Sequence, residues 1–199
     1  MIDNPLTTKL KPYRILLASG SPRRQQYLKE LGISFDIVKN EVEEVYPDDL
    51  KGEQIAIYLA KLKSGALKDI LKEKDILLTA DTVVWFNDRS LAKPAVIEEA
   101  KQMLKELSGQ WHEVITSVCF TTVAEQRIVT STTRVRIKEL SAEEIDYYVE
   151  VYKPFDKAGA YGIQEWLGSI GIIEIKGSYV NVVGLPTDLV YKTLMDMVS

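Results

Sequence analysis

The chain has 199 residues, of which 46% are hydrophobic and 27% charged, and its formal net charge of −4 gives no overall field for nucleic acid. A single cysteine, Cys119, excludes an intrachain disulfide and fits a buried thiol in a reducing cytoplasm, while one histidine, His112, excludes a His-rich zinc site. In an enzyme of this composition, carboxylates would do the acid–base or metal work, with Mg²⁺ or Mn²⁺ as the favoured ions.

The N-terminal residues 1–12 are polar and lack the apolar segment of a signal peptide. We expect them to form a loose overhang, followed by one domain over 13–199. No apolar run approaches membrane-spanning length, so we expect no membrane partner, and the single cysteine favours the cytoplasm as the location.

A strand predicted over 14–19 runs through a tight turn into a helix predicted over 21–31, which Ser21 can cap. Arg23 and Arg24 then fall in the first helical turn, where the partial positive charge of the helix N-terminus disfavours them. Two arginines beside free backbone donors would bind a multiply charged anion, although they could also be solvated surface residues. The strand–turn–helix context favours a phosphate site.

The rest of the chain mixes strand–helix units with a hairpin and contains neither a Walker A sequence nor a Rossmann glycine fingerprint. We therefore predict an α/β fold with a mixed sheet flanked by helices. The further predicted elements are a strand over 35–39, an acidic loop over 41–50, a helix over 52–71, a strand over 75–86, a helix over 96–107, hairpin strands over 112–123 and 127–138, a helix capped by Ser141 that ends before Pro154, an apolar strand within 168–176, and a helix opened by Pro186.

Carboxylates in two places are candidates for chemistry. Asp81 interrupts an apolar strand pattern, so it must be paired, bind an ion or face a cleft, unless it only caps a turn at the strand end. Glu43 and Glu44 lie in the acidic loop, where such residues are usually solvated. Together with Asp81 they could form a two-carboxylate Mg²⁺ site that the phosphate oxygens of a substrate complete.

Three lysines are candidates for phosphate binding. Lys63 lies at the margin of the apolar stripe of the helix predicted over 52–71, from which it could snorkel to solvent or reach a phosphate. Lys93 directly precedes a predicted helix, and Lys157 precedes the glycine-containing run 158–164. Glycine lets backbone approach a ligand closely, although such runs also occur in plain turns. With the arginines and carboxylates, these lysines form a set suited to a metal-bridged polyphosphate.

Taken together and in this order, these motifs resemble the Maf family of nucleotide pyrophosphatases. The resemblance spans nearly the whole chain from Arg14 to the last predicted helix. It rests on residues 19–24, 43–44, 63, 80–82, 93–94, 107–109 with His112, 157–164 and 184–186.

The resemblance implies a fold like that of the inosine triphosphate pyrophosphatases, with a long mixed sheet between helical layers and the active-site cleft between two lobes. It also implies a cytoplasmic homodimer that requires a divalent metal cation, Mg²⁺ or Mn²⁺. The implied reaction is the cleavage of a nucleoside triphosphate substrate to the monophosphate and pyrophosphate, by attack of water on the α-phosphorus.

One branch of the family acts on dTTP and UTP and has Arg, Thr and Gln at three specificity positions, which match Arg23, Thr82 and Gln164. The branch that acts on 7-methyl-GTP has other residues there. The resemblance therefore implies dTTP and UTP as substrates. One departure bears on the pocket: Glu165 and Trp166 follow Gln164 where glycine is usual, and they could reshape the pocket floor.

The resemblance also implies roles for individual residues. Asp81 would be the proton acceptor and, with Glu44, a metal ligand, although whether Asp81 is a base or only a ligand stays open. The residues that would bind the triphosphate and neutralise its charge are Arg23, Arg24, Lys63, Lys93 and Lys157.

Two other functions remain open at this point. The chain could be a pyrophosphatase for modified nucleotides, or a non-catalytic nucleotide-binding regulator of septum formation, a process to which the family has been linked. The acidic pair of Glu44 and Asp81 favours an enzyme, because a pure binder of polyanions has no need for carboxylates in its pocket.

Overall fold

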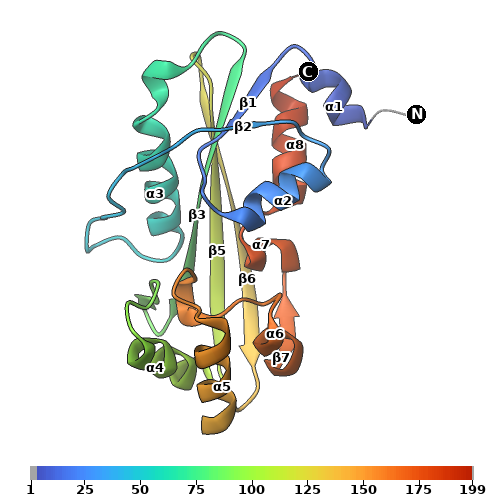
Figure 1. Cartoon of the computed structure of the whole chain (residues 1–199). Coiled ribbons are helices and arrows are strands. Elements are labelled where there is room, and N and C mark those ends of the chain that lie inside the picture. The colour runs from blue at the N-terminus through green and yellow to red at the C-terminus, as the bar shows by residue number, and fades with distance from the viewer. Residues whose placement is uncertain (1–3, 199) are drawn as a thin grey trace.

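The computed structural model describes residues 4–198, which form two lobes built on one shared sheet (Figure 1). Its strands are β1 (Arg14–Leu17), β2 (Asp36–Ile37), β3 (Asp75–Phe86), β4 (Arg89–Ser90), β5 (Trp111–Thr121), β6 (Gln126–Ile137) and β7 (Ile172–Lys176). Its α-helices are α1 (Pro5–Leu10), α2 (Pro22–Glu30), α3 (Glu53–Gly65), α4 (Ile97–Leu107), α5 (Ala142–Tyr152), α6 (Trp166–Gly171), α7 (Tyr179–Val183) and α8 (Thr187–Met197). The 3₁₀ turns η1 (Lys68–Ile70) and η2 (Ala158–Ala160) complete the described elements.

The sheet is mixed, as the sequence predicted. Its strand order is β2–β1–β3–β5–β6–β7, and β4 pairs with the C-terminal end of β3. β1 runs parallel to β2 and β3, whereas β3, β5, β6 and β7 pair antiparallel in succession. The long strands β3, β5 and β6 run from one lobe into the other, so the same sheet forms part of both lobes (Figure 1).

Side-chain alternation along β3 assigns each face of the sheet to a different set of helices. On one face the Thr79 hydroxyl donates to the Ala60 carbonyl of α3 at 2.7 Å, and Val83 packs against the same helix. On the other face Leu78 and Ala80 belong to the core cluster that α2 and α8 cover. Consecutive residues of β3 therefore have different helical neighbours.

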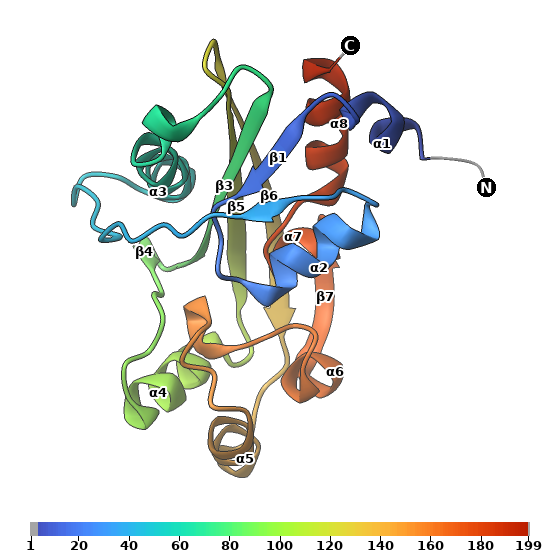
Figure 2. The same cartoon turned by 45° about the horizontal axis from the view of Figure 1, so that its top comes forward.

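The second lobe has a core of its own. Leu104 of α4 and Tyr148 of α5 are fully buried against Val135 of β6, together with Leu167 of α6. Figure 2 shows these three helices gathered at the end of the long strands, away from α2 and α8. Along the length of β3, the helices α2 and α8 therefore pack near one end and the helices α4, α5 and α6 near the other.

The N-terminal residues differ from the expected loose overhang. The helix α1 begins after Asn4, whose side-chain oxygen accepts from the Leu6 N–H at 2.9 Å. Leu6 and Leu10 are buried in the cluster that contains α8. The stretch looked polar, but two leucines one helical turn apart are enough to give it a buried face. Residues 1–3 of the predicted overhang lie outside the described residues.

The largest difference in predicted bounds concerns the helix α3. The helix expected over 52–71 ends at Gly65, where the Asn40 side chain donates to the Lys63 carbonyl at 2.7 Å and so satisfies a terminal acceptor. The strand predicted within 168–176 is present as β7, although it begins only at Ile172, because the preceding residues belong to the short helix α6. In contrast, the predicted capping box of α5 is present, with Ser141 and Glu144 bonded reciprocally.

The thiol of Cys119 is fully buried in β5, which confirms the predicted buried cysteine, and burial raises its pKa. Across residues 4–198, none of the helices combines the length and apolar character needed to cross a bilayer.

Candidate active site

A cavity of about 820 Å³ opens where the two lobes meet. The N-terminus of α2, the loop before α3, the middle of β3 and the segment after α5 all contribute to its wall. Glu43 is not part of this wall. The structure brings the other predicted site residues to the cavity, namely Arg23, Arg24, Glu44, Lys63, Asp81, Thr82, Lys93, Lys157 and Gln164.

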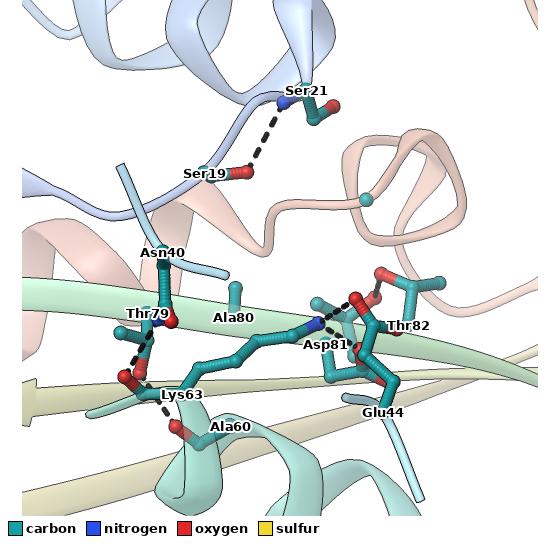
Figure 3. Close-up of polar contacts among 12 residues, drawn as sticks. Ser19, Ser21, Asn40, Glu44, Ala60, Lys63, Thr79, Ala80, Asp81 and Thr82 are labelled. Carbon is teal, nitrogen blue, oxygen red and sulfur yellow. Dashed lines mark hydrogen bonds and ion pairs between the residues drawn. The ribbon is translucent and has the colours of Figure 1, made fainter. Parts of the chain in front are cut away.

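The centre of the site is an ammonium group held between two carboxylates. Lys63, in the last turn of α3, extends along β3 with its Nζ 2.6 Å from Asp81 Oδ1 and 3.0 Å from Glu44 Oε1 (Figure 3). Asp81 shares the β3 face that packs on α3, so the alternation of the strand aims its carboxylate at this helix. The Lys63 side chain is only 12% exposed, which strengthens both ion pairs.

The two carboxylates differ in their acidity. Burial raises the pKa of Asp81 above its ordinary value, and the nearby Lys63 and Arg24 only partly oppose this effect. For Glu44, partial burial also acts to raise the pKa, but the attraction of Lys63, Lys93 and Arg24 outweighs it and the pKa is lowered. Asp81 is therefore the better proton acceptor of the pair, because a base is most effective when its pKa approaches the working pH.

The donor chemistry of this pair fits a hard divalent cation. Glu44 and Asp81 already share a single cationic group, so their oxygens lie within reach of one charge. Among residues 4–198 there is no cluster of three or more histidine, cysteine or acidic side chains able to hold a metal ion. An ion here would depend on two carboxylates plus ligand or water oxygens, which is the usual arrangement for Mg²⁺ at phosphate substrates.

The N-terminus of α2 opens into the same cavity. Ser21 occupies the N-cap position, but its side chain makes no capping hydrogen bond, contrary to the expectation from sequence. Instead the Ser21 N–H donates to Ser19 Oγ at 3.3 Å. Arg23 reaches across the cavity, with Nη1 3.1 Å from Asp156 Oδ2. The free donors of this helix end and Arg23 together suit a bound anion.

Arg24 connects distant parts of the site. Its guanidinium donates to the Gly184 carbonyl at 2.9 Å, the Ala80 carbonyl at 3.0 Å, Ser19 Oγ at 3.3 Å and Thr82 Oγ1 at 2.9 Å. A guanidinium has five N–H donors, so these four bonds leave one for a ligand. Arg24 thus fixes the backbone beside Asp81 as well as adding positive charge.

Thr82 belongs to a directed chain of hydroxyl groups. The Thr116 hydroxyl donates to the Asn181 carbonyl at 3.1 Å, so it must accept from Thr82 Oγ1, which lies 3.0 Å away. Thr82 also accepts from Arg24 Nη2. Because its single proton is committed to Thr116, Thr82 can offer a ligand only a remaining lone pair.

The opposite wall carries Lys93, Lys157 and Gln164. The loop that contains Lys93 is tied to η2, since the Gly159 N–H donates to the Leu91 carbonyl at 3.0 Å. Gly159 has φ of +69°, and a Cβ there would come within 2.9 Å of Val84, so only glycine fits this contact. Lys157 is buried, whereas Gln164 is an exposed residue of the cavity wall.

Sequence reasoning named Glu165 only as a departure near the pocket floor, and it missed Asp156 and Tyr148. Lys157 Nζ lies 2.6 Å from Asp156 Oδ1 and 3.0 Å from Glu165 Oε1, and Glu165 Oε2 accepts from the Tyr148 hydroxyl. Asp156 directly precedes Lys157, which is a signal that could have found it. Tyr148 carries no such signal, because a buried aromatic residue on a helix is typical of an ordinary core.

Comparisons with known proteins identify the family of the chain. The sequence matches the family described as Maf-like protein over residues 14–197. Similar curated proteins include the dTTP/UTP pyrophosphatases of Flavobacterium johnsoniae, 52% identical over 97% of this chain and 100% of that protein, and of Christiangramia forsetii, 52% identical over 96% and 97%.

Among solved structures, the Staphylococcus aureus Ham1 protein is a distant neighbour, with a TM-score of 0.40 and 13% identity over 62% of this chain and 71% of that one. This likeness is too distant to bear on function. The family match covers most of the chain, and the curated relatives align over nearly their whole length. The chain therefore belongs to the Maf-like protein family.

Proposed function

We propose that this protein is a nucleoside triphosphate pyrophosphatase that hydrolyses dTTP and UTP to the monophosphate and pyrophosphate. The observation that carries the proposal is Asp81, a buried carboxylate of raised pKa at the wall of a cavity whose cationic side chains come from both lobes. The curated relatives named dTTP/UTP pyrophosphatase support the choice of substrate.

The proposed reaction is attack of water on the α-phosphorus, with pyrophosphate as the leaving group. Asp81 accepts the proton of the attacking water, and its raised pKa suits it to that task. Lys63 holds the Asp81 carboxylate in place and stays close to the reacting phosphate. The residues that neutralise the triphosphate and the charge building on pyrophosphate are Arg23, Arg24, Lys93 and Lys157.

We propose Glu44 and Asp81 as the residues that would hold a divalent cation, Mg²⁺ or Mn²⁺. Their shared cationic neighbour and the charge of a triphosphate support this assignment. When bound, the ion supplies positive charge to the phosphate oxygens. We also propose that the enzyme is cytoplasmic and homodimeric. Sedimentation of the purified protein would test whether it is a dimer.

The bond that breaks can be identified with labelled water. Hydrolysis of dTTP in H₂¹⁸O with added Mn²⁺ or Mg²⁺ should release pyrophosphate and place the ¹⁸O in dTMP, because water attacks the α-phosphorus. A parallel panel with UTP, CTP, GTP and modified nucleotides would rank the substrates. Orthophosphate as the first product, or ¹⁸O in pyrophosphate, would rule out the mechanism. Absence of turnover with every nucleotide would favour a non-catalytic binder instead.

A further inference from the structure

Lys157 is held between two carboxylates of different character. Its side chain is 9% exposed, and its Nζ contacts Asp156, which is 60% exposed, and Glu165, which is 19% exposed. Asp156 lies on the rim and also pairs with Arg23, whereas Glu165 lies behind the cavity wall. Asp156 can therefore give way to an incoming anion, while Glu165 stays on the lysine.

The Glu165 carboxylate is itself anchored. The Tyr148 hydroxyl donates to Glu165 Oε2 and accepts from the Gly162 N–H at 2.9 Å. Tyr148 is fully buried, and burial together with the bond to Glu165 raises its pKa, so the hydroxyl keeps its proton and acts as a donor. One hydroxyl thus fixes both the carboxylate and the backbone two residues before Gln164.

The backbone leaves room for this arrangement. A Cβ at Gly162 would lie 2.8 Å from Glu165 Cδ, closer than such atoms normally approach, and 3.0 Å from Lys157 Cε, which is a tight contact. The ion pair therefore packs directly over a position without a side chain. This close packing over Gly162 is independent of the hydrogen bonds, and it also indicates that Glu165 and Lys157 hold fixed positions relative to each other.

We propose that Glu165 is a positioning residue that, anchored by Tyr148, holds the ammonium of Lys157 at the cavity wall for the phosphates of the substrate. An ammonium group has three N–H donors, and two of them meet carboxylates, so the third can serve a phosphate oxygen. This inference rests on the proposed function only for the identity of the ligand, a nucleoside triphosphate. Any polyphosphate carries the phosphate oxygens that Lys157 would bind.

A double-mutant cycle between Glu165→Gln and Lys157→Met tests the proposal through binding. The probe is inorganic tripolyphosphate, titrated calorimetrically into the intact protein. Glu165→Gln should weaken binding by about 3- to 10-fold in the parent and leave it unchanged when Lys157→Met is already present, because Glu165 acts through the lysine. Tyr148→Phe, which removes only the hydroxyl, should weaken binding in the same lysine-dependent way.

Two controls separate positioning from general damage. Glu174→Gln makes the same chemical change in an exposed ion pair with Lys176 on β7 and should not alter binding. The Tm of each variant shows whether it is folded at the temperature of the titration. An equal fold-loss from Glu165→Gln with and without Lys157 would overturn the proposal, since it would show a purely structural role.

The cycle is independent of turnover. If the parent binds tripolyphosphate and the lysine-dependent loss is present but no pyrophosphate is released from any nucleotide, the proposed function fails and the positioning role stands. If pyrophosphate is released but the two substitutions act additively on binding, the positioning role fails and the enzyme assignment stands.

Discussion

Asp81 combines a proposed catalytic role with a cost to the fold. We expect Asp81→Asn to lower kcat by about 10²–10⁴-fold, because the amide keeps the shape of the carboxylate but cannot accept the proton. The pKa of Asp81 is raised in the folded state, so the fold binds its proton more tightly than the unfolded chain does, and stability is lost as pH rises through that pKa. At neutral pH the variant should therefore have a Tm at or above the parent's.

Asp88→Asn in the exposed turn that ends β3 is a matched control and should retain parental kcat and Tm. Steady-state kinetics and thermal unfolding measure both effects. An Asp81→Asn variant that keeps more than about a tenth of the parental kcat would remove Asp81 from the role of proton acceptor.

Gln164 offers one donor and one acceptor, which suit the edge of uracil or thymine. Gln164→Glu removes the donor and adds charge, so the preference for dTTP and UTP should weaken, because unpaired polar groups penalise a base that lacks the right partner. The measurement is kcat/KM for dTTP, UTP, CTP and GTP in the parent, in Gln164→Glu and in Gln110→Glu, an exposed control outside the cavity wall. An unchanged ranking would exclude base recognition by Gln164.

His112 is buried in β5, where Nε2 lies 2.6 Å from the Tyr161 hydroxyl. Burial lowers its pKa from 6.5 to about 4. The unfolded chain therefore binds the proton more tightly, and stability falls as pH drops from about 6.5 towards about 4. The loss should be on the order of 3 kcal/mol for a shift of this size.

Because His112 is the only histidine, its imidazole gives a single set of NMR signals. Their titration should have a midpoint near 4, and chemical denaturation over the same pH range should follow the loss of stability. A midpoint near 6.5 would contradict the buried, neutral imidazole.

At the scale of elements, α1 contributes to the core and is not an appendage. Leu6 is fully buried in the cluster shared with α8, so Leu6→Ala should destabilise the protein by about 2–5 kcal/mol. Lys9→Ala on the exposed face of the same helix should change stability little. Urea unfolding of both variants measures the difference. Equal stability of Leu6→Ala and the parent would show that α1 does not pack on α8 in solution.

The sequence predicted elements well where a local pattern was complete. The strand over 75–86 and the capping box at Ser141 have local signals, and the structure confirms both. The end of α3 depends on a side chain from a distant loop, Asn40, which no local pattern reveals. Within 168–176 the predicted strand is present as β7, but periodicity did not locate its start, because the glycine and apolar residues at the end of α6 fit a strand equally well.

At the scale of the whole molecule, the cavity is assembled from both lobes. The loop that carries Glu44 belongs to the lobe that contains α3, and the segment that carries Lys157 and Gln164 belongs to the lobe that contains α5. A bound triphosphate would contact both, so an α,β-imido analogue of dTTP should slow amide hydrogen exchange in residues 39–46 and 156–165 together. Protection confined to one of these segments would contradict a ligand held between the lobes.

Sequence predicted which charged and polar residues meet at the cavity, whereas it did not predict their contacts. Motifs and family resemblance supplied residues that the fold brings to one cavity. They did not indicate that Arg24 binds four protein groups or that Tyr148 anchors Glu165, because such bonds depend on three-dimensional proximity between segments far apart in the chain.

The alternation of β3 has a consequence for how this gene can change. Asp81 and Thr82 are neighbours in sequence, yet one meets Lys63 of α3 and the other meets Arg24 of α2 on the opposite face. Because side chains alternate with a period of two, insertion or deletion of a single codon within β3 would exchange the two faces. The carboxylate would then face α2 and lose its ion pair with Lys63, and the hydroxyl chain from Thr82 to Thr116 would be broken. Insertions and deletions in this protein should therefore accumulate in the loops and turns. Within β3, substitutions should be tolerated far better than the insertion or deletion of a residue.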